Sequence, residues 1–498
     1  MAIDPRTPVL VGVGSITQRD DDRDPADLLE PVELMVAAVR AAAADADAPG
    51  LLAEVELITV PKGIWGYEDP GRFVAEQIGA ATTTRTVLAE VGILQQTLID
   101  QACAAIAAGD LQVAVVCGGE ARNRAVRAAR AGIEATEVAA PGPPDDLQLP
   151  AGEIITAVEI ERDLAVPAHQ YALVESVLRH VDGLSASQQR ARLGSLWGGF
   201  ARVAAANPGA WDRSGPGPAD IATASAGNRM IASPYTKRLC SQWNVDQGAA
   251  LLLTSVAAAE RAGVPRDRWV FPVAAAGSQT MIPLPCRASI ERSPATAAVG
   301  EHVLELAGID LDAVAHLDIY SCFPAAVQVQ ARELGLPIEG PVDGSIDRPL
   351  TVTGGMTFAG GPLNSYVLHS TAAMADVLRA DAGALGLVTS VSGMLTKPGM
   401  ALWSTEPGDG FRLGDATDRA RADTETRPLD PEATGEGRVV AHTVVHERGV
   451  PARLVALVET TDGRRTVAVD ADAGRAAEAV EQDLVDQTVL VPRPGVLT

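Results

Sequence analysis

The sequence predicts an α/β protein made of two similar halves, with a long insertion in the first half and a small β-domain at the C-terminus. Two observations support this fold class. Apolar strand-like runs alternate with helical runs in both halves, and the C-terminal segment holds short alternating strands around one helix. The length of 498 residues also exceeds the roughly 250 to 300 residues at which a single hydrophobic core stops growing.

The first half is expected over residues 1–265. PVLVGVGSI near the N-terminus and the later ELITV are typical of buried strands. The segment from Leu94 to Gly109 repeats apolar residues at intervals of four, as one face of a helix does, and LQVAVVCGGE follows it as another buried strand. This alternation predicts a doubly wound parallel sheet with helices on both faces.

An insertion is expected over about residues 121–235, where the pattern changes to polar helices and to Pro/Gly-rich loops such as RSGPGPAD. After it, QGAALLLTSVAAAERAG completes the first half. A second alternation over residues 266–412 contains WVFPVAAAG, LDIY, the helical AAVQVQARELG, and the strands GLVTSV and MALW. The repetition predicts a second α/β half.

The C-terminal region changes in composition. Residues 413–436 are rich in Asp, Glu, Arg, Gly and Pro, which predicts a linker. Residues 437–498 contain GRVVAHTVVH, ARLVALVET, RRTVAVD and QTVLVP, with a helix near 475–484. Short strands around one helix predict a small β-barrel of the OB type. We expect the rest of the chain to stay folded after removal of this domain.

Charge and hydropathy exclude several classes of function. Asp and Glu outnumber Lys and Arg by 64 to 40, and the net charge of −24 repels a phosphate backbone. No apolar run approaches the roughly 20 residues that a membrane helix needs, and the N-terminus lacks the pattern of a signal peptide. We therefore expect no nucleic-acid partner, no membrane partner and a cytoplasmic location.

Metal sites are not expected either. The five cysteines form no C-x-x-C pair, and His442 and His446 share a strand face without further ligands. Lysine occurs only at Lys62, Lys237 and Lys397. Lys237 and Lys397 lie beside the segments described next and are therefore of interest as functional residues.

Four ordered segments resemble the thiolase superfamily. They are AAIAAGDLQVAVVCGGEARN, CSQWNVDQGAALLLTSVAAAERAG, DIYSCFPAAV and TVTGGMTFAGGPLNSY, and the similarity extends over roughly residues 5–405. The chain looks most like thiolase-like proteins of type 1, often named acetyl-CoA acetyltransferases. The resemblance implies a layered α-β-α-β-α fold, acyltransferase chemistry, CoA binding and a place in lipid or acyl-CoA metabolism.

The chain departs from the thiolase pattern at its catalytic positions. Gly92 stands where the nucleophilic cysteine is expected, and Gly361 stands where the catalytic histidine is expected. Ser390 replaces the second catalytic cysteine, and Tyr320 replaces the asparagine of the N-E-A-F motif. Because thiolysis needs a thiolate and a base, ordinary thiolase chemistry is not expected.

Cys322, His369 and Ser390 remain as catalytic candidates. Cys322 follows a strand end that faces the cleft in relatives, where open α/β sheets bind ligands. His369 follows the glycine-rich loop and could replace the missing base. A purely structural role stays open for each residue: Cys322 as a buried core thiol, His369 as a histidine that is hydrogen-bonded in the core, and Ser390 as a serine without a base beside it.

CoA contacts are expected from Gly360, Gly361, Arg124 and Arg127. The two glycines belong to the loop similar to the thiolase glycine loop, and the two arginines lie in a basic cluster that could receive phosphates. A solvated helix face is the alternative for the arginines. CoA or an acyl-CoA is the expected ligand, and no covalently bound cofactor is expected.

Three functions stay open. The first is an acyl-CoA-binding protein without the usual nucleophile, and the second is an active acyltransferase or retro-aldol lyase that uses Cys322 and His369. The third is an interaction scaffold. The C-terminal domain resembles OB-fold proteins that partner divergent thiolases, so self-association or a lipid-metabolism protein partner also remains open.

Overall fold

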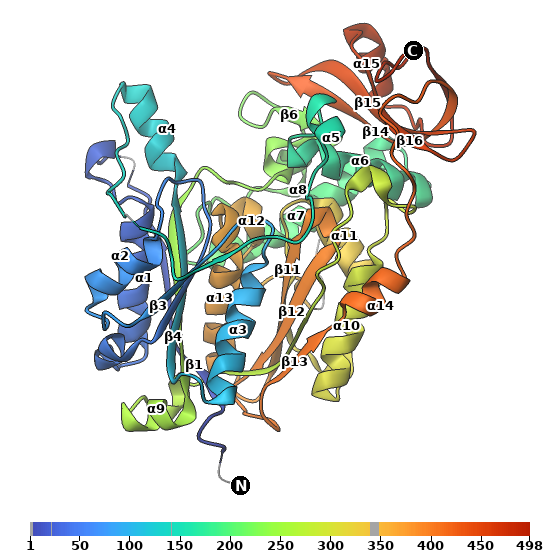
Figure 1. The fold of residues 1–498 in the computed structure, drawn as a ribbon. Coiled ribbons are helices and arrows are strands. Elements are labelled where there is room, and N and C mark those ends of the chain that lie inside the picture. The colour runs from blue at the N-terminus through green and yellow to red at the C-terminus, as the bar shows by residue number, and fades with distance from the viewer. Residues whose placement is uncertain (1–2, 21, 141, 339–347) are drawn as a thin grey trace.

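The computed structural model describes residues 3–20, 22–140, 142–338 and 348–498. Their strands form three sheets, and helices cover and separate the first two (Figure 1). Within the described residues, no helix is long and apolar enough to cross a membrane.

The sheet of the first half has six strands in the order β1-β8-β4-β2-β3-β5. β2, β3, β4 and β5 run parallel to one another, but β8 pairs antiparallel with both β1 and β4. The prediction of a doubly wound parallel sheet is therefore wrong at β8. Every residue of β8 is buried, and a fully buried strand carries no sequence signal for its direction. The strands are β1 (Pro8–Thr17), β2 (Leu57–Pro61), β3 (Arg85–Ala89), β4 (Val113–Ala121), β5 (Asp146–Gln148) and β8 (Asp246–Ser255).

Helix α1 (Pro31–Asp45) packs directly on the backbone of β1. A Cβ built on Gly12 or on Gly14 would lie 2.0 Å from a carbonyl oxygen of α1. Glycine at both positions therefore permits the close approach of the helix to the strand. Helices α2 (Pro70–Ile78) and α9 (Val256–Arg261) complete this part of the first half.

The sheet of the second half has the order β10-β11-β12-β9-β13. Helices α3 (Gln95–Ala108) and α13 (Tyr366–Ala380) contact strands of both sheets and form the middle layer (Figure 1). Helix α10 (Pro294–Ala307) packs on the outer side beside α11 (Pro324–Glu333). The five predicted layers are thus confirmed. The strands are β9 (Phe271–Gly277), β10 (His316–Asp318), β11 (Leu385–Ser392), β12 (Lys397–Ser404) and β13 (Arg412–Asp415).

The segment expected as a linker is partly ordered into the second half. β13 pairs parallel with β9, and α14 (Thr417–Ala422) packs on α10. β13 is an edge strand whose side chains are largely exposed, so its composition resembles that of a loop. The second half therefore extends beyond residue 412.

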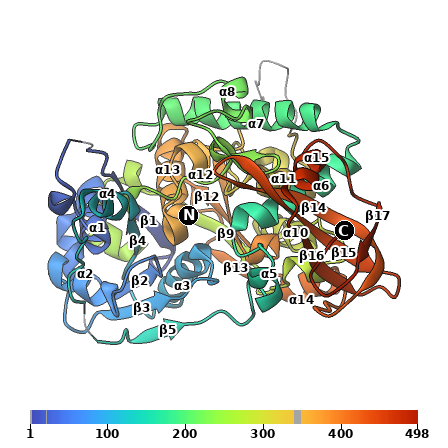
Figure 2. The same ribbon diagram turned by 90° about the horizontal axis from the view of Figure 1, so that it is seen from above.

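Helices α5 to α8 of the insertion lie at one end of the sheets in Figure 1, and Figure 2 shows the molecule from that end. It contributes several helices and the short strands β6 (Met230–Ala232) and β7 (Tyr235–Thr236). The helices are α4 (Arg122–Ala131), α5 (Ala157–Glu161), α6 (Pro167–Val181), α7 (Ala186–Ala206) and α8 (Pro218–Ala222). A core of buried side chains continues from these helices into the middle layer.

The C-terminal strands join the insertion in one sheet of order β16-β15-β14-β6-β7, with β17 paired to β14. Val440, Val455 and Val467 belong to the same hydrophobic cluster as the two halves. This shared core argues against a removable domain, because loss of these strands would expose part of the main core. That the rest of the chain stays folded without them remains a prediction. Closure into an OB-type barrel stays a prediction. The elements are β14 (Gly435–Glu447), β15 (Val450–Thr460), β16 (Arg465–Asp470), α15 (Ala473–Ala479) and β17 (Thr488–Val491).

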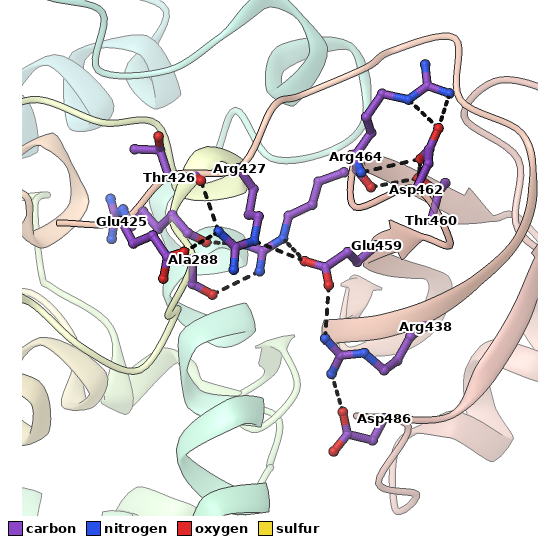
Figure 3. Close-up of polar contacts among 12 residues, drawn as sticks. Ala288, Glu425, Thr426, Arg427, Arg438, Glu459, Thr460, Asp462, Arg464 and Asp486 are labelled. Atoms are coloured by element: carbon purple, nitrogen blue, oxygen red, sulfur yellow. Dashed lines mark hydrogen bonds and ion pairs between the residues drawn. The ribbon is translucent and has the colours of Figure 1, made fainter.

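A cluster of charged side chains also attaches this region to the second half (Figure 3). The carboxylate of Glu459 accepts hydrogen bonds from Arg465 at 3.0 Å and from Arg438 at 3.2 Å. Arg465 is buried and donates to the backbone carbonyls of Arg287 and Ala288. Glu459 thereby compensates a buried guanidinium at the contact between the two parts.

Candidate functional site

A cavity of about 840 Å³ opens where the two halves and the insertion meet. The loops that follow β3, β10 and β11 line one side of it, and the beginning of α6 with the segment 227–244 lines the other. Its wall is largely apolar. Carboxyl ends of strands are the usual ligand-binding edge of open α/β sheets, so this cavity is the candidate site.

Gly92 lines the cavity with its backbone alone. Its φ is +107°, and a Cβ at this position would lie 2.9 Å from Cβ of Pro150. Its carbonyl accepts a hydrogen bond of 2.9 Å from Nζ of Lys397, a buried lysine whose pKa burial lowers to about 8. The local backbone and its neighbours therefore leave no room for a nucleophilic side chain at residue 92.

Gly361 and Tyr320 line the same cavity. A Cβ on Gly361 would lie 2.3 Å from Oγ of Ser241, and the Gly361 amide donates to the carbonyl of Gln242. The ring of Tyr320 packs edge-on against Tyr366 with centroids 5.9 Å apart. Neither position presents an imidazole or an amide to a ligand.

Cys322 also lines the cavity, next to Tyr171 and Phe323. Burial raises the pKa of the Cys322 thiol to about 12, and burial likewise raises the pKa of Cys240, a second cysteine of the wall, to about 12. Both thiols are therefore protonated near neutral pH. Because the thiolate is the nucleophile, neither cysteine is activated in this state.

His369 and Ser390 are not brought to the cavity. His369 lies on α13, and its Nδ1 is 2.9 Å from Oγ of Ser15. Burial lowers its pKa to about 4, and its Nε2 has no partner in the described part of the chain. Ser390 is fully buried in β11. Of the three catalytic candidates, the structure places only Cys322 at the site, so a base role for His369 does not fit this position.

Most residues expected to bind CoA also lie elsewhere. Arg124 is buried and donates to the carbonyl of Thr136, whereas Arg127 donates to the carbonyls of Asp20 and Arg23. A Cβ on Gly360 would lie 2.1 Å from Oε1 of Gln247, which it packs against. None of these three residues lines the cavity, so their role in CoA binding stays a prediction from the sequence.

Three basic residues at the cavity were not selected from the sequence as phosphate ligands. Arg229, Lys237 and Arg238 line it, and Arg229 and Lys237 are exposed. Among the residues that the structure describes, none of the three pairs with a carboxylate, although acidic residues outnumber basic ones by 64 to 40. The rarity of lysine in the sequence was the available signal for Lys237.

Trp243 adds an exposed aromatic surface at the same wall. Trp243 is 44% exposed, and the guanidinium of Arg122 stacks on its ring at 3.7 Å from the centroid. The site thus combines an apolar interior, two protonated thiols and a rim of cations that have no carboxylate partner among the described residues. Such a surface suits an elongated ligand with one apolar and one anionic end.

Neither a protein-family model nor a curated protein matches this chain. Among solved structures, it is similar to a monomeric SCP2-thiolase-like protein type 1 from Mycobacterium smegmatis, with 29% sequence identity and a TM-score of 0.82. The similarity covers 99% of this chain and 98% of that one.

Two further structures share the fold at lower identity. The Ltp2-ChsH2(DUF35) aldolase has 20% identity and a TM-score of 0.55, and the similarity covers 81% of this chain and 99% of that one. An acetyl-CoA acetyltransferase from Syntrophomonas wolfei has 16% identity and a TM-score of 0.57, with coverage of 80% and 99%.

Proposed function

We propose that this chain, which is similar in structure to an SCP2-thiolase-like protein type 1, binds CoA or acyl-CoA in the cavity without catalysing ordinary thiolysis. The observation that carries this proposal is the combination of Gly92 with a cationic cavity rim. The cavity accepts the ligand, while the position of the nucleophile has no side chain.

The basic residues at the cavity rim are evidence that one end of the ligand is anionic. Arg229, Lys237 and Arg238 have no carboxylate partner within the described ranges and face the cavity. CoA carries a diphosphate between its pantetheine arm and its nucleotide. Arginine and lysine bind phosphate oxygens through charge-assisted hydrogen bonds, so these three residues replace Arg124 and Arg127 in the proposal.

The apolar interior of the cavity is evidence that the thioester end of the ligand binds there. Tyr171, Phe323 and Met356 contribute to its wall, and the stacked rings of Tyr171 and Phe323 lie 4.8 Å apart. A pantetheine arm with a short acyl group is compatible with the cavity volume of about 840 Å³.

An active acyl transfer or retro-aldol reaction is the second candidate, favoured by the position of Cys322 in the cavity wall. Its protonated thiol counts against it, because burial raises the pKa to about 12. Acylation of Cys322 by an acyl-CoA, detected by peptide mass spectrometry, would favour this second function over binding alone.

Calorimetric titration with CoA tests the binding proposal. We expect saturable heat with the natural protein and a loss of affinity of about tenfold or more in Lys237→Gln/Arg238→Gln, since two phosphate contacts are removed. A matched control, Lys62→Gln/Arg493→Gln, makes the same charge change outside the cavity wall. Absence of heat with the natural protein, or equal losses in both double variants, would contradict the proposal.

A further inference from the structure

We propose that the turn between β14 and β15 forms, with the insertion, a subsite for the 3′-phosphate of CoA, so that the C-terminal domain takes part in ligand binding. This inference rests on the proposed function and adds a phosphate subsite to the same ligand. Arg448 from the turn and Arg229 from the insertion are the residues that would hold the phosphate.

A second hollow of about 520 Å³ lies beside the main cavity. Its wall combines residues 224–226 of the insertion with Arg448 and Gly449 of the turn. Arg229 lines both hollows, so the two adjoin at this side chain. A Cβ on Gly449 would lie 3.3 Å from Cβ of Arg229, which places the turn against the insertion.

The geometry of the turn does not itself require arginine. Glu447 pairs with Val450, so Arg448 and Gly449 are the two central residues of the hairpin turn. Their φ angles are +53° and +88°. Such turns favour Asn, Asp or Gly at the first central position, and a long cationic side chain there gains nothing from the local backbone. A contact outside the turn would give the arginine a role.

The charges around the second hollow are unbalanced. Arg229 and Arg448 have no ion-pair partner in the part of the chain that the structure describes, and the adjacent Glu447 pairs with Arg453. Two guanidinium groups on one hollow repel each other unless an anion lies between them. In a chain with a net charge of −24, this local excess of positive charge indicates an anion site.

The order of groups along CoA matches the order of the residues. With the thioester in the apolar interior, the diphosphate reaches the rim at Lys237 and Arg238. The ribose 3′-phosphate lies beyond the diphosphate, where Arg229 leads into the second hollow with Arg448. A guanidinium binds phosphate oxygens in a bidentate manner, and the two arginines could share one phosphate.

Comparison of CoA with dephospho-CoA tests this subsite, because the two ligands differ only in the 3′-phosphate. We expect the natural protein to bind dephospho-CoA about tenfold more weakly, the effect of losing charge-assisted contacts. Arg448→Asn should reduce this preference to within about twofold by weakening CoA binding alone. Asparagine suits the turn conformation, so thermal unfolding should show that the variant stays folded.

Arg493→Asn serves as the control, since Arg493 is an exposed residue of the same domain outside both hollows. It should keep the full preference for CoA. Equal affinity of the natural protein for both ligands, or an unchanged preference in Arg448→Asn, would overturn the inference and leave the proposed function intact. Failure of the natural protein to bind either ligand would contradict the proposed function and this inference together.

Discussion

Two glycines of the candidate site occupy positions where a side chain would collide with neighbouring atoms. At Gly92 the obstacle is Pro150 together with a φ of +107°, and at Gly361 it is the hydroxyl of Ser241. The sequence alone shows only that cysteine and histidine are missing. The structure adds that the surrounding residues fill the space, so single substitutions would not rebuild the thiolase groups.

The variant Gly92→Cys tests this point. We expect the free energy of unfolding to fall by about 1 to 3 kcal/mol, because the new Cβ is both crowded and held at positive φ. Thiolysis of acetoacetyl-CoA should stay undetectable, since Gly361 provides no imidazole. Urea unfolding and a thiolysis assay measure both effects, with Gly50→Ala, which meets no neighbour, as control. A stable and active Gly92→Cys would contradict the account.

At the scale of elements, the predicted strands and helices of both halves are present, and the five-layer arrangement follows from them. The differences occur where the local sequence pattern does not indicate which strands pair with each other or in which direction. β8 is buried on both faces and gives no sign of its antiparallel direction. β13 has the composition of a loop, and the pairing of β14 with β6 joins segments about 200 residues apart in the chain.

The candidate site was predictable only in part, for the same reason. Gly92, Gly361, Tyr320 and Cys322 lie in or beside segments that resemble the family, and all four line the cavity. His369 is close in sequence to the glycine-rich loop, but α13 places it in the core instead. The basic rim comes from the insertion, which has no periodic pattern from which its folded position could be inferred.

His442 on β14 makes the contact with the C-terminal domain sensitive to acid. Its Nε2 accepts from the amide of Leu484, and burial lowers its pKa to about 3 from the usual 6.5. The unfolded chain therefore binds a proton below pH 6.5 that the folded chain excludes. Stability should fall by on the order of 2 to 3 kcal/mol as the pH falls from 6.5 to about 4.5.

Urea unfolding across this pH range should show a smaller acid effect in His442→Gln, because glutamine can keep the acceptor without a proton to gain. His369, whose pKa burial lowers to about 4, should account for part of the acid effect that remains. Identical pH dependence in the natural protein and in His442→Gln would contradict the assignment.

Across the whole molecule, charge is distributed unevenly: most of the protein repels anions, whereas the rim of the cavity carries basic groups that can bind them. The net charge of −24 disfavours anionic ligands in general, yet basic groups without carboxylate partners in the described residues gather at the cavity. The insertion and the C-terminal strands share one sheet, so the parts that carry these groups are held together. Binding of an anionic CoA ester should weaken as salt screens this local field.

The most direct test of the central claim is one calorimetric titration with acetyl-CoA, followed by intact-mass measurement of the same sample. We expect saturable heat, which reports binding, together with an unchanged protein mass, because the described residues place no activated nucleophile at the cavity. Absence of heat would contradict acyl-CoA binding. A stoichiometric acetyl adduct would contradict the claim that the protein binds its ligand without forming an acyl-enzyme.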